Sequence, residues 1–292
     1  MNAISPFSLV TGSDTLSEAL PARQGRYRLS PDNRAEAARR RRLMRDLEAA
    51  TASSGFVLHY QPRLALEQGA IIGAEALIRW PHPKLGMIPP SDFIPLAEQG
   101  GQITAIGGWV LRQACLAARD WSHHPHPWSV SVNVSARQLS DGALLGQVAD
   151  ALDQSGLQPD RLEIELTESL LVDMSMETLL TLSAIRDLGV GIALDDFGTG
   201  FASLGMLKRL PLTVMKLDRS LVRDLPHDRE DAAIVRAIIQ TGHALGLSVV
   251  AEGIETEAQR AFLSGSGCDE GQGYLFSHPL PLDQLQARMT KA

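Results

Sequence analysis

Cysteine is scarce in this chain, and long hydrophobic runs are absent. Only two cysteines, Cys115 and Cys268, occur among 292 residues, far apart and without neighbours that suggest a metal or redox motif. Two isolated thiols exclude a disulfide framework and favour a reducing, cytoplasmic compartment. No stretch approaches the ~18 apolar residues of a membrane span, and the N-terminus lacks the pattern of a secretory leader. We therefore expect a soluble protein with no transmembrane segment.

An excess of positive charge is also missing. The chain has 27 Lys and Arg against 34 Asp and Glu, which gives a formal net charge of -7. Binding of duplex nucleic acid depends on neutralising phosphates, so that class of partner is not expected. A small phosphorylated ligand remains compatible, because a few local cations or a metal can hold it. The hydrophobic content of 44% is enough for a large core, in one barrel of ~250 residues or in two smaller domains.

The first 30 residues lack hydrophobic periodicity, and we interpret residues 1–30 as a flexible tail or linker. A helical pattern begins at Asp32 and leads into the main domain, residues 31–292. Arg39 to Arg42 form a basic run within this helix. The favoured interpretation is a solvated helical face, and contact with a membrane surface or an upstream partner is the alternative.

From residue 56 onward, short apolar runs alternate with longer amphipathic segments. This alternation predicts an α/β protein with a TIM-like (β/α)8 barrel. The first two strands are joined by only a short connection around Gly69, so we expect the first strand to be antiparallel. The predicted strands are residues 56–60, 71–78, 128–134, 161–166, 191–194, 214–217, 247–250 and 273–276.

Two adjacent carboxylates, Asp195 and Asp196, end one of these strands and precede a glycine-rich turn. Neighbouring acids beside a buried strand repel each other unless a cation compensates them, and hard oxygen ligands favour Mg²⁺ or Mn²⁺. Active sites of such barrels lie at the C-terminal ends of the strands, where the other strands also carry polar residues. These strand-end residues are Gln61, Glu75, Arg79, Asn133, Glu165, Glu168, Lys216, Asp218, Glu252, Glu255 and Gln272.

Some of these positions have ordinary structural explanations. Asn133 is compatible with a satisfied amide in the core, and Lys216 with an edge lysine that discourages strand pairing. Glu163 and Glu165 share one face of their strand, so either is a candidate for the inward position. A lysine among apolar residues is desolvated unless acids surround it, which favours a site with Lys216 inside an acidic cage.

The motifs around these residues resemble the EAL-domain family of bacterial cyclic di-GMP phosphodiesterases. The resemblance extends from about Leu43 to Pro281. The matching segments, in chain order, are Tyr60-Gln61-Pro62, Glu75-Ala76-Leu77 with Ile78-Arg79-Trp80, Phe93 to Glu98, Ser131 to Ser135, Glu165 to Ser169, Asp195 to Gly200, Lys216-Leu217-Asp218, Ala251 to Glu255, and Gln272-Gly273-Tyr274.

The resemblance implies a cage for two divalent ions, Mg²⁺ or Mn²⁺. Glu75, Asn133, Glu165 and Asp195 would hold one ion, and Asp195 would bridge to a second that Asp196 also ligates. Glu252 would complete the cage, directly or through water. Hydrolysis of a phosphodiester by such a pair of ions would give linear pGpG.

Further roles follow from the same resemblance. Lys216 would position or deprotonate the attacking water, and Gln272 would bind water or substrate. Gln61, Arg79 and Asp218 match positions that contact the dinucleotide, with Arg79 at a phosphate oxygen. Glu168 would hold the loop from Asp195 to Gly200 in its metal-competent shape, and a homodimer is expected by analogy.

Two alternatives to a phosphodiesterase stay open at this stage. Some members of the family have lost ligands and act as cyclic di-GMP sensors, although this chain keeps every position that can be aligned. Acidic ligands with a strand-end lysine also suit enolase-like proton abstraction on a barrel. The adjacent aspartates and the phosphate-directed Arg79 favour hydrolysis of a phosphodiester.

Overall fold

The computed structural model describes residues 31–123, 128–171, 174–198, 200 and 204–289. The predicted tail, residues 1–30, lies outside the described residues. The chain divides into two compact units, Met1–Arg40 and Arg41–Ala292, and the account below concerns the second. Helix α1 (Pro31–Ala52) crosses this division. Its side chains at Leu43, Leu47 and Ala50 are buried in the main hydrophobic core, at the spacing of one helical face.

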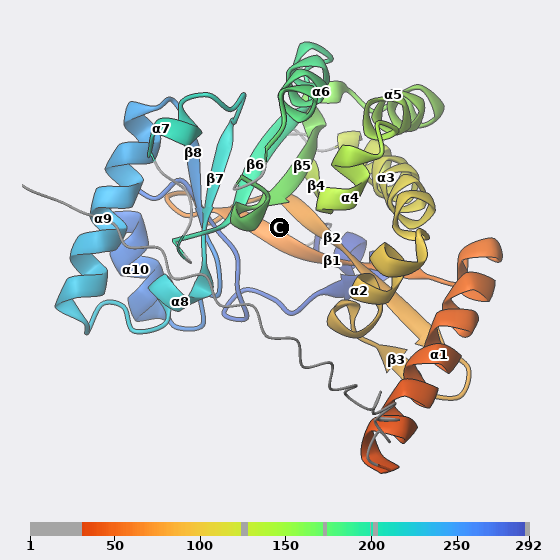
Figure 1. Ribbon diagram of the computed structural model, residues 1–292. Coiled ribbons are helices and arrows are strands. Elements are labelled where there is room, and N and C mark those ends of the chain that lie inside the picture. The colour runs from red at the N-terminus through yellow and green to blue at the C-terminus, as the bar shows by residue number, and fades with distance from the viewer. Residues whose placement is uncertain (1–30, 124–127, 172–173, 199, 201–203, 290–292) are drawn as a thin grey trace, which may run out of the picture. The chain divides into compact units, whose positions relative to one another are not determined.

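The second unit is a closed barrel of eight strands surrounded by helices (Figure 1). Around the barrel the strands follow the order β1-β9-β8-β7-β6-β5-β4-β2, and the pairing of β2 with β1 closes the ring. The predicted TIM-like barrel is therefore confirmed. The barrel strands are β1 (Val57–Ala65), β2 (Ile71–His82), β4 (Ser129–Asn133), β5 (Leu162–Thr167), β6 (Gly191–Phe197), β7 (Val214–Leu217), β8 (Ser248–Ala251) and β9 (Glu270–Gly271).

The helices pack outside the barrel and bury the outward faces of its strands. Val132, Ile164 and Leu194 are fully or almost fully buried, since their side chains alternate with the inward polar ones. The helical elements are α2 (Pro90–Gly100), α3 (Ile103–Arg119), η1 (Asp120–His123), α4 (Ala136–Ser140), α5 (Leu144–Ser155), η2 (Pro159–Arg161), η3 (Glu168–Leu171), α6 (Met176–Asp187), α7 (Leu204–Leu207), α8 (Arg219–Val222), α9 (Arg229–Ala244), α10 (Glu257–Gly265) and α11 (Leu282–Met289).

The first strand is antiparallel to both of its neighbours in the ring, as the short connection predicted. A turn of five residues, 66–70, joins β1 to β2, which is too short for a parallel crossover. The resulting register places Gln61 opposite Glu75. Because β1 runs in the reverse direction, the residues at its start reach the same rim as the C-terminal ends of the other strands.

The prediction for the last strand was wrong. The eighth strand is Glu270–Gly271, and residues 273–276 form a turn instead. Glu270 and Gly271 pair with Val250 and Ala251 of β8, so the last strand of the ring ends before the apolar residues of 273–276 begin. A Cβ on Gly273 would lie 2.1 Å from the carbonyl oxygen of Ile254, and the chain there turns across the rim. Leu275 and Phe276 pack on a hydrophobic cluster, which explains their apolar character.

Two short strands outside the ring had no clear sequence signal. Strand β3 (Gly86–Ile88) extends β2 as an antiparallel hairpin, and β10 (Leu280–Pro281) pairs with the start of β1. Each has only two or three residues, too few for alternation to be recognisable.

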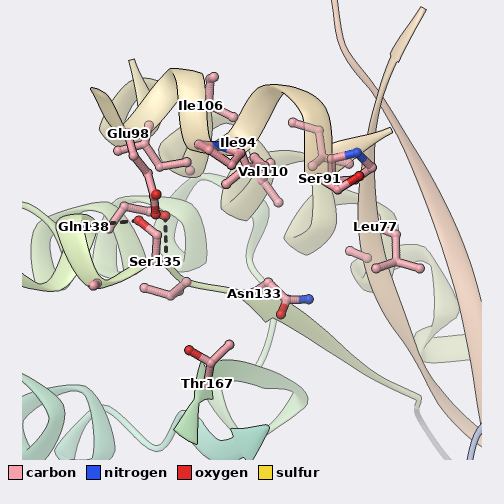
Figure 2. A pocket seen from close by; sticks show the side chains of 18 of the residues that line it. Leu77, Ser91, Ile94, Glu98, Ile106, Val110, Asn133, Ser135, Gln138 and Thr167 are labelled. Carbon is pink, nitrogen blue, oxygen red and sulfur yellow. Dashed lines mark hydrogen bonds between the residues drawn. The ribbon is translucent and has the colours of Figure 1, made fainter. Parts of the chain in front are cut away.

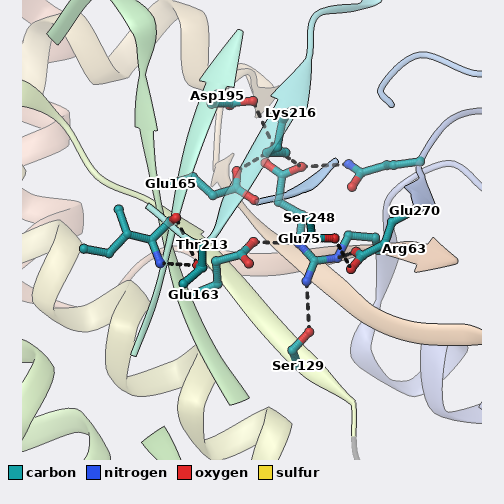
Figure 3. Close-up of polar contacts among 12 residues, drawn as sticks. Arg63, Glu75, Ser129, Glu163, Glu165, Asp195, Thr213, Lys216, Ser248 and Glu270 are labelled. Atoms are coloured by element: carbon teal, nitrogen blue, oxygen red, sulfur yellow. Dashed lines mark hydrogen bonds and ion pairs between the residues drawn. The ribbon is translucent and has the colours of Figure 1, made fainter. Parts of the chain in front are cut away.

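A buried ion cluster ties four strands together toward the far end of the barrel (Figure 3). Arg63 of β1 contacts Glu163 of β5 at 2.6 Å and Glu270 of β9 at 2.7 Å, and it donates to the Ser129 hydroxyl of β4 at 3.0 Å. Burial alone would lower the pKa of Arg63, but the two carboxylates outweigh it and raise that pKa. Arg63 is therefore a permanent cation inside the barrel.

We expect Arg63→Met to lower the free energy of unfolding by ~3–5 kcal/mol, because Glu163 and Glu270 would stay buried without a cation. Urea denaturation monitored by circular dichroism measures this change. The control is Arg119→Met, whose partner Asp120 is 3.1 Å away in an exposed pair and which should cost about 0–1 kcal/mol. Similar small losses in both variants would show that the buried cluster does not hold the barrel together.

Candidate active site

Lys216 of β7 lies at the centre of a ring of carboxylates near the C-terminal ends of the strands (Figure 3). Its side chain is 1% exposed. The ammonium nitrogen Nζ lies 2.6 Å from Glu252, 2.8 Å from Glu165, 3.1 Å from Asp195 and 3.8 Å from Glu75. These acids come from strands β2, β5 and β6 and from the end of β8, so one cation joins four sides of the barrel. The explanation of Lys216 as an edge lysine is wrong.

Glu75 of β2 is fixed by amide side chains as well as by Lys216. Asn133 donates from Nδ2 to its Oε1 at 2.6 Å, and Gln272 donates from Nε2 to its Oε2 at 2.7 Å. The same Gln272 nitrogen reaches Oε1 of Gln61 at 3.0 Å, and Gln61 donates to the carbonyl of Ser277 at 3.1 Å. Both carboxylate oxygens of Glu75 are thus held in place, one by Asn133 at the end of β4 and the other by Gln272 just after β9.

Asp195 and Asp196 converge only because the backbone leaves strand geometry between them. Consecutive residues of a strand point to opposite faces, yet Asp196 has a φ of +58°, in the left-handed region. The pairing of β6 with β7 also shifts register between Leu194 and Phe197. Such irregularities re-aim side chains next to active sites. As a result, carboxylate oxygens of Asp195, Asp196 and Glu252 lie within 4.8 Å of one another.

Glu168 lies outside the ring of acids and contacts the loop that follows β6. It begins η3, directly after β5, and is 2% exposed. Its Oε2 accepts hydrogen bonds from the backbone amides of Gly198 at 3.0 Å and Gly200 at 3.4 Å. One buried carboxylate therefore connects the end of β5 to the backbone just beyond Asp195 and Asp196.

The crowding of acids disturbs their ionisation. Burial, followed by the charges of Glu75 and Asp195, raises the pKa of Glu165 well above its usual value despite Lys216. Burial raises the pKa of Glu252 to about 7 and, with the charge of Asp195, also raises that of Asp196. For Glu75 the effect of burial is outweighed by Lys216 and by hydrogen bonds, and its pKa is lowered. One ammonium thus offsets only part of the negative charge that these acids bring together.

The donor set fits divalent cations. Oε1 of Glu165 is buried and has no hydrogen-bond partner in the described part of the chain, although the rest of the carboxylate contacts Lys216. A buried, unpaired carboxylate oxygen is costly unless a cation binds it. The neighbouring ligands are carboxylate and amide oxygens, which Mg²⁺ and Mn²⁺ prefer.

Two cavities flank Glu75. The larger, about 700 Å³, extends over Asn133 and Asp196 toward α2 and α3, where Ile94, Ile106 and other apolar side chains line it (Figure 2). The smaller, about 200 Å³, lies on the other side of Glu75, against Glu252, Gln272, Arg219 and Tyr274. The acids therefore lie between two spaces, an arrangement that suits a ligand with two ends and a reacting group in the middle.

Two predicted substrate contacts lie apart from this network. Arg79 is half-buried and donates to the carbonyl of Ile78 at 2.9 Å; burial lowers its pKa, against the opposing effect of Glu75. Asp218 accepts a hydrogen bond from the backbone of Ser220 at 2.9 Å and so begins helix α8. Its charge still contributes to the raised pKa of Asp196, which places it near the rim.

Sequence reasoning assigned no role to several residues that the structure places at or near the site. Arg219 and Tyr274 line the smaller cavity, and Glu98 and Gln138 line the larger. A signal existed for Arg219, because it directly follows Asp218 at the end of a strand. The helix residues Glu98 and Gln138 gave none, since their positions depend on how α2 and α4 pack on the barrel.

The sequence matches the EAL domain family over residues 44–279, which covers the barrel, and the chain belongs to this family. EAL domains depend on divalent metal ions, and the acidic cluster of Asp195, Asp196 and Glu252 is present here. No helix in the described part of the chain is long and apolar enough to cross a membrane.

Several known proteins are similar to this chain. It is 46% identical over 246 residues to the bifunctional diguanylate cyclase/cyclic di-GMP phosphodiesterase MucR of Pseudomonas aeruginosa, covering 84% of this chain and 36% of that protein. It is 45% identical to the cyclic di-GMP phosphodiesterase NbdA of the same organism, covering 82% and 31%. The chain thus spans about a third of the length of these relatives. A structure of the PaMucR phosphodiesterase in complex with c-di-GMP matches with a TM-score of 0.79, covering 84% of this chain and 99% of that one.

Proposed function

We propose that this protein hydrolyses cyclic di-GMP to linear pGpG with the help of two divalent metal ions, Mg²⁺ or Mn²⁺, and so lowers cyclic di-GMP signalling. The observation that carries the proposal is the complete ring of acids around Lys216. Similarity to named cyclic di-GMP phosphodiesterases supports the choice of substrate. The two cavities on either side of Glu75 offer space for the two halves of a dinucleotide.

The ions would be held by residues that already converge. Glu75, Asn133, Glu165 and Asp195 would bind one ion, Asp195 and Asp196 the other, and Glu252 would complete the cage. Support comes from the unpaired oxygen of Glu165 and from the proximity of Asp195, Asp196 and Glu252. Bound there, two ions supply a nucleophile at neutral pH and offset the charge of the phosphate.

The other side chains position substrate and water. Lys216 stays an ammonium, because its acidic neighbours raise its pKa well above the usual value although burial alone would lower it. It therefore orients the attacking water and offsets negative charge. Gln272 and Gln61 form the wall beside Glu75, Arg79 contacts a phosphate oxygen, and Asp218 contributes at the rim.

A catalytically inactive cyclic di-GMP sensor is the second candidate, because a protein with the same cavities could bind the dinucleotide without cleaving it. The complete set of acids argues for turnover. Enolase-like chemistry is not retained, since membership of the EAL family points to phosphodiesters.

The purified protein should convert cyclic di-GMP to pGpG when Mg²⁺ or Mn²⁺ is present. Chromatography measures the amount of pGpG formed. Glu75→Ala should lower the rate by at least ~100-fold, since it removes an expected metal ligand and the partner of Asn133 and Gln272. The matched control is Glu67→Ala, at an exposed glutamate in the turn after β1, which should retain the wild-type rate. Binding of cyclic di-GMP without turnover would favour the sensor, and normal turnover by Glu75→Ala would refute the assigned cage.

Glu168→Ala should weaken metal binding while the barrel stays folded. Loss of its carboxylate frees the amides of Gly198 and Gly200, and the backbone that orients Asp195 and Asp196 loses its support. The measurement is the rise in melting temperature on titration with Mn²⁺, which should require ~10-fold more metal in the variant. Glu177→Ala, at an exposed glutamate of α6, serves as the control. Identical titration curves for Glu168→Ala and the wild type would contradict this role.

We further propose that the protein forms a homodimer through α6. Met176 is 71% exposed and Leu180 is 64% exposed, and four residues apart they lie on one face of the helix. Light scattering should show a dimer for the wild type and a monomer for Leu180→Glu. Ile234→Glu, at an exposed apolar position of α9, should leave the dimer intact. A monomeric wild type, or a dimer that survives Leu180→Glu, would contradict this interface.

A further inference from the structure

The antiparallel hairpin of β2 and β3 ends in an exposed apolar tip. Leu85, in its turn, is 56% exposed, and Met87 of β3 is 52% exposed. Met87 pairs with Pro81 across the hairpin, and both residues are exposed. The next pair, Trp80 and Ile88, is buried, because side chains alternate between the two faces of paired strands. Water therefore surrounds two large apolar side chains whose transfer to an apolar phase would be favourable.

Hydrogen bonds of His82 hold this tip in shape and tie it to α1. Its side chain is 4% exposed, and its Nδ1 accepts from the backbone amides of Lys84 at 3.1 Å and Leu85 at 3.2 Å. A ring nitrogen that accepts carries no proton, so the proton of this imidazole is on Nε2. Nε2 thus donates to Oδ2 of Asp46 in α1, 3.2 Å away. The tip is therefore preformed and lies beside α1 (Figure 1).

The exposed face of α1 next to the tip is basic. Arg41, Arg42 and Arg45 are exposed, and the first two belong to the basic run noted in the sequence. Nε of Arg42 lies 3.8 Å from Oδ2 of Asp46, the same carboxylate that His82 contacts. Arg41 and Arg45 are one helical turn apart, and neither forms an ion pair with another described residue. Their charges therefore remain available to an anionic surface.

We propose that this surface docks on a membrane that contains anionic phospholipids. The two apolar side chains insert at the level of the lipid headgroups, and the surrounding cations contact the lipid phosphates. Apolar side chains and basic side chains together are what holds a peripheral protein on an anionic bilayer. The inference concerns where the protein acts, and it does not depend on the proposed hydrolysis. This hairpin patch consists of Arg41, Arg42, Arg45, Lys84, Leu85 and Met87.

Charge favours a lipid surface over other occupants of the hairpin patch. The patch contains four cations, and only two acids, Asp46 and Glu48, lie beside them on α1, so it is locally positive although the chain has a net charge of -7. Residues 1–30 contain three arginines against one aspartate and one glutamate, so this segment does not complement the patch. Lys84 at the tip disfavours a protein partner, because lysine is depleted in protein interfaces. An anionic bilayer complements both the charge and the apolar tip.

Sedimentation of the full chain with vesicles measures this docking. Vesicles of phosphatidylcholine and phosphatidylserine in equal amounts should bind the protein, and vesicles of phosphatidylcholine alone should not. Leu85→Gln combined with Met87→Gln should weaken binding by ~10-fold, because the apolar insertion is lost. Both positions are exposed, so the melting temperature should stay unchanged. Ile234→Gln, at a 46% exposed position of α9, is the control and should bind as the wild type does.

A second pair of variants tests the charges of the patch. Arg41→Gln combined with Arg45→Gln should also weaken binding to the anionic vesicles by ~10-fold. Added NaCl should weaken binding of the wild type, since salt screens exposed charges. The matched control combines Arg119→Gln with Arg223→Gln, at exposed arginines outside the patch, and should bind as the wild type does.

Three results would overturn the proposal. The first is a wild-type protein that does not bind the anionic vesicles. The second is undiminished binding by both patch variants, which would place the contact elsewhere on the chain. The third is an equal loss in patch and control variants, which would show adsorption without a defined surface.

Discussion

The burial of Lys216 among carboxylates is the interaction on which the site depends. Acids from four sides of the barrel cannot be brought within contact distance of one another without a cation, since their repulsion and desolvation would exceed what packing returns. Lys216 supplies that cation from the chain itself and reaches Glu165, Glu252 and Asp195 within 3.1 Å. One ammonium balances only part of the negative charge. The acids are therefore held together, and the site can still accept further positive charge.

A second buried cation, Arg63, compensates carboxylates one layer deeper in the barrel. Glu163 and Glu165 both point inward, and they serve different cations: Glu163 pairs with Arg63, and Glu165 pairs with Lys216. Alternation along β5 makes this possible, because residues two apart face the same side. The pair of Arg63 and Glu163 has a structural role. The pair of Lys216 and Glu165 leaves one oxygen of Glu165 without a hydrogen-bond partner among the described residues. Two glutamates only two residues apart on β5 therefore differ in role: Glu163 stabilises the barrel, and Glu165 belongs to the candidate site.

Much of this arrangement was predictable from the sequence, and the failures have physical causes. Strand ends carry their polar residues in a local pattern, so the acidic cage was predictable. The short connection after the first strand predicted that this strand is antiparallel. The strand expected at residues 273–276 was wrong because apolar residues in a rim turn look the same as those in a strand. Sequence also left open which of Glu163 and Glu165 faces inward, and it gave no sign that Arg63 is the partner of Glu163. Pairings between distant strands depend on how the ring closes, which no local pattern encodes.

The charge of the site also constrains how a ligand enters it. The proposed ligand, a cyclic dinucleotide, carries two negative phosphodiesters, and the cage would offer it five carboxylates against one ammonium. At contact distances in a buried site this repulsion is barely screened, so cations have to precede or accompany the ligand. Arg79 is close enough to Glu75 for the carboxylate to raise its pKa against the effect of burial, and Arg219 lines the smaller cavity beside Glu75. Two arginines at the rim and divalent ions at the centre would give an acidic protein a local surface that attracts an anion. The overall charge of -7 then disfavours long nucleic acids without excluding a small one.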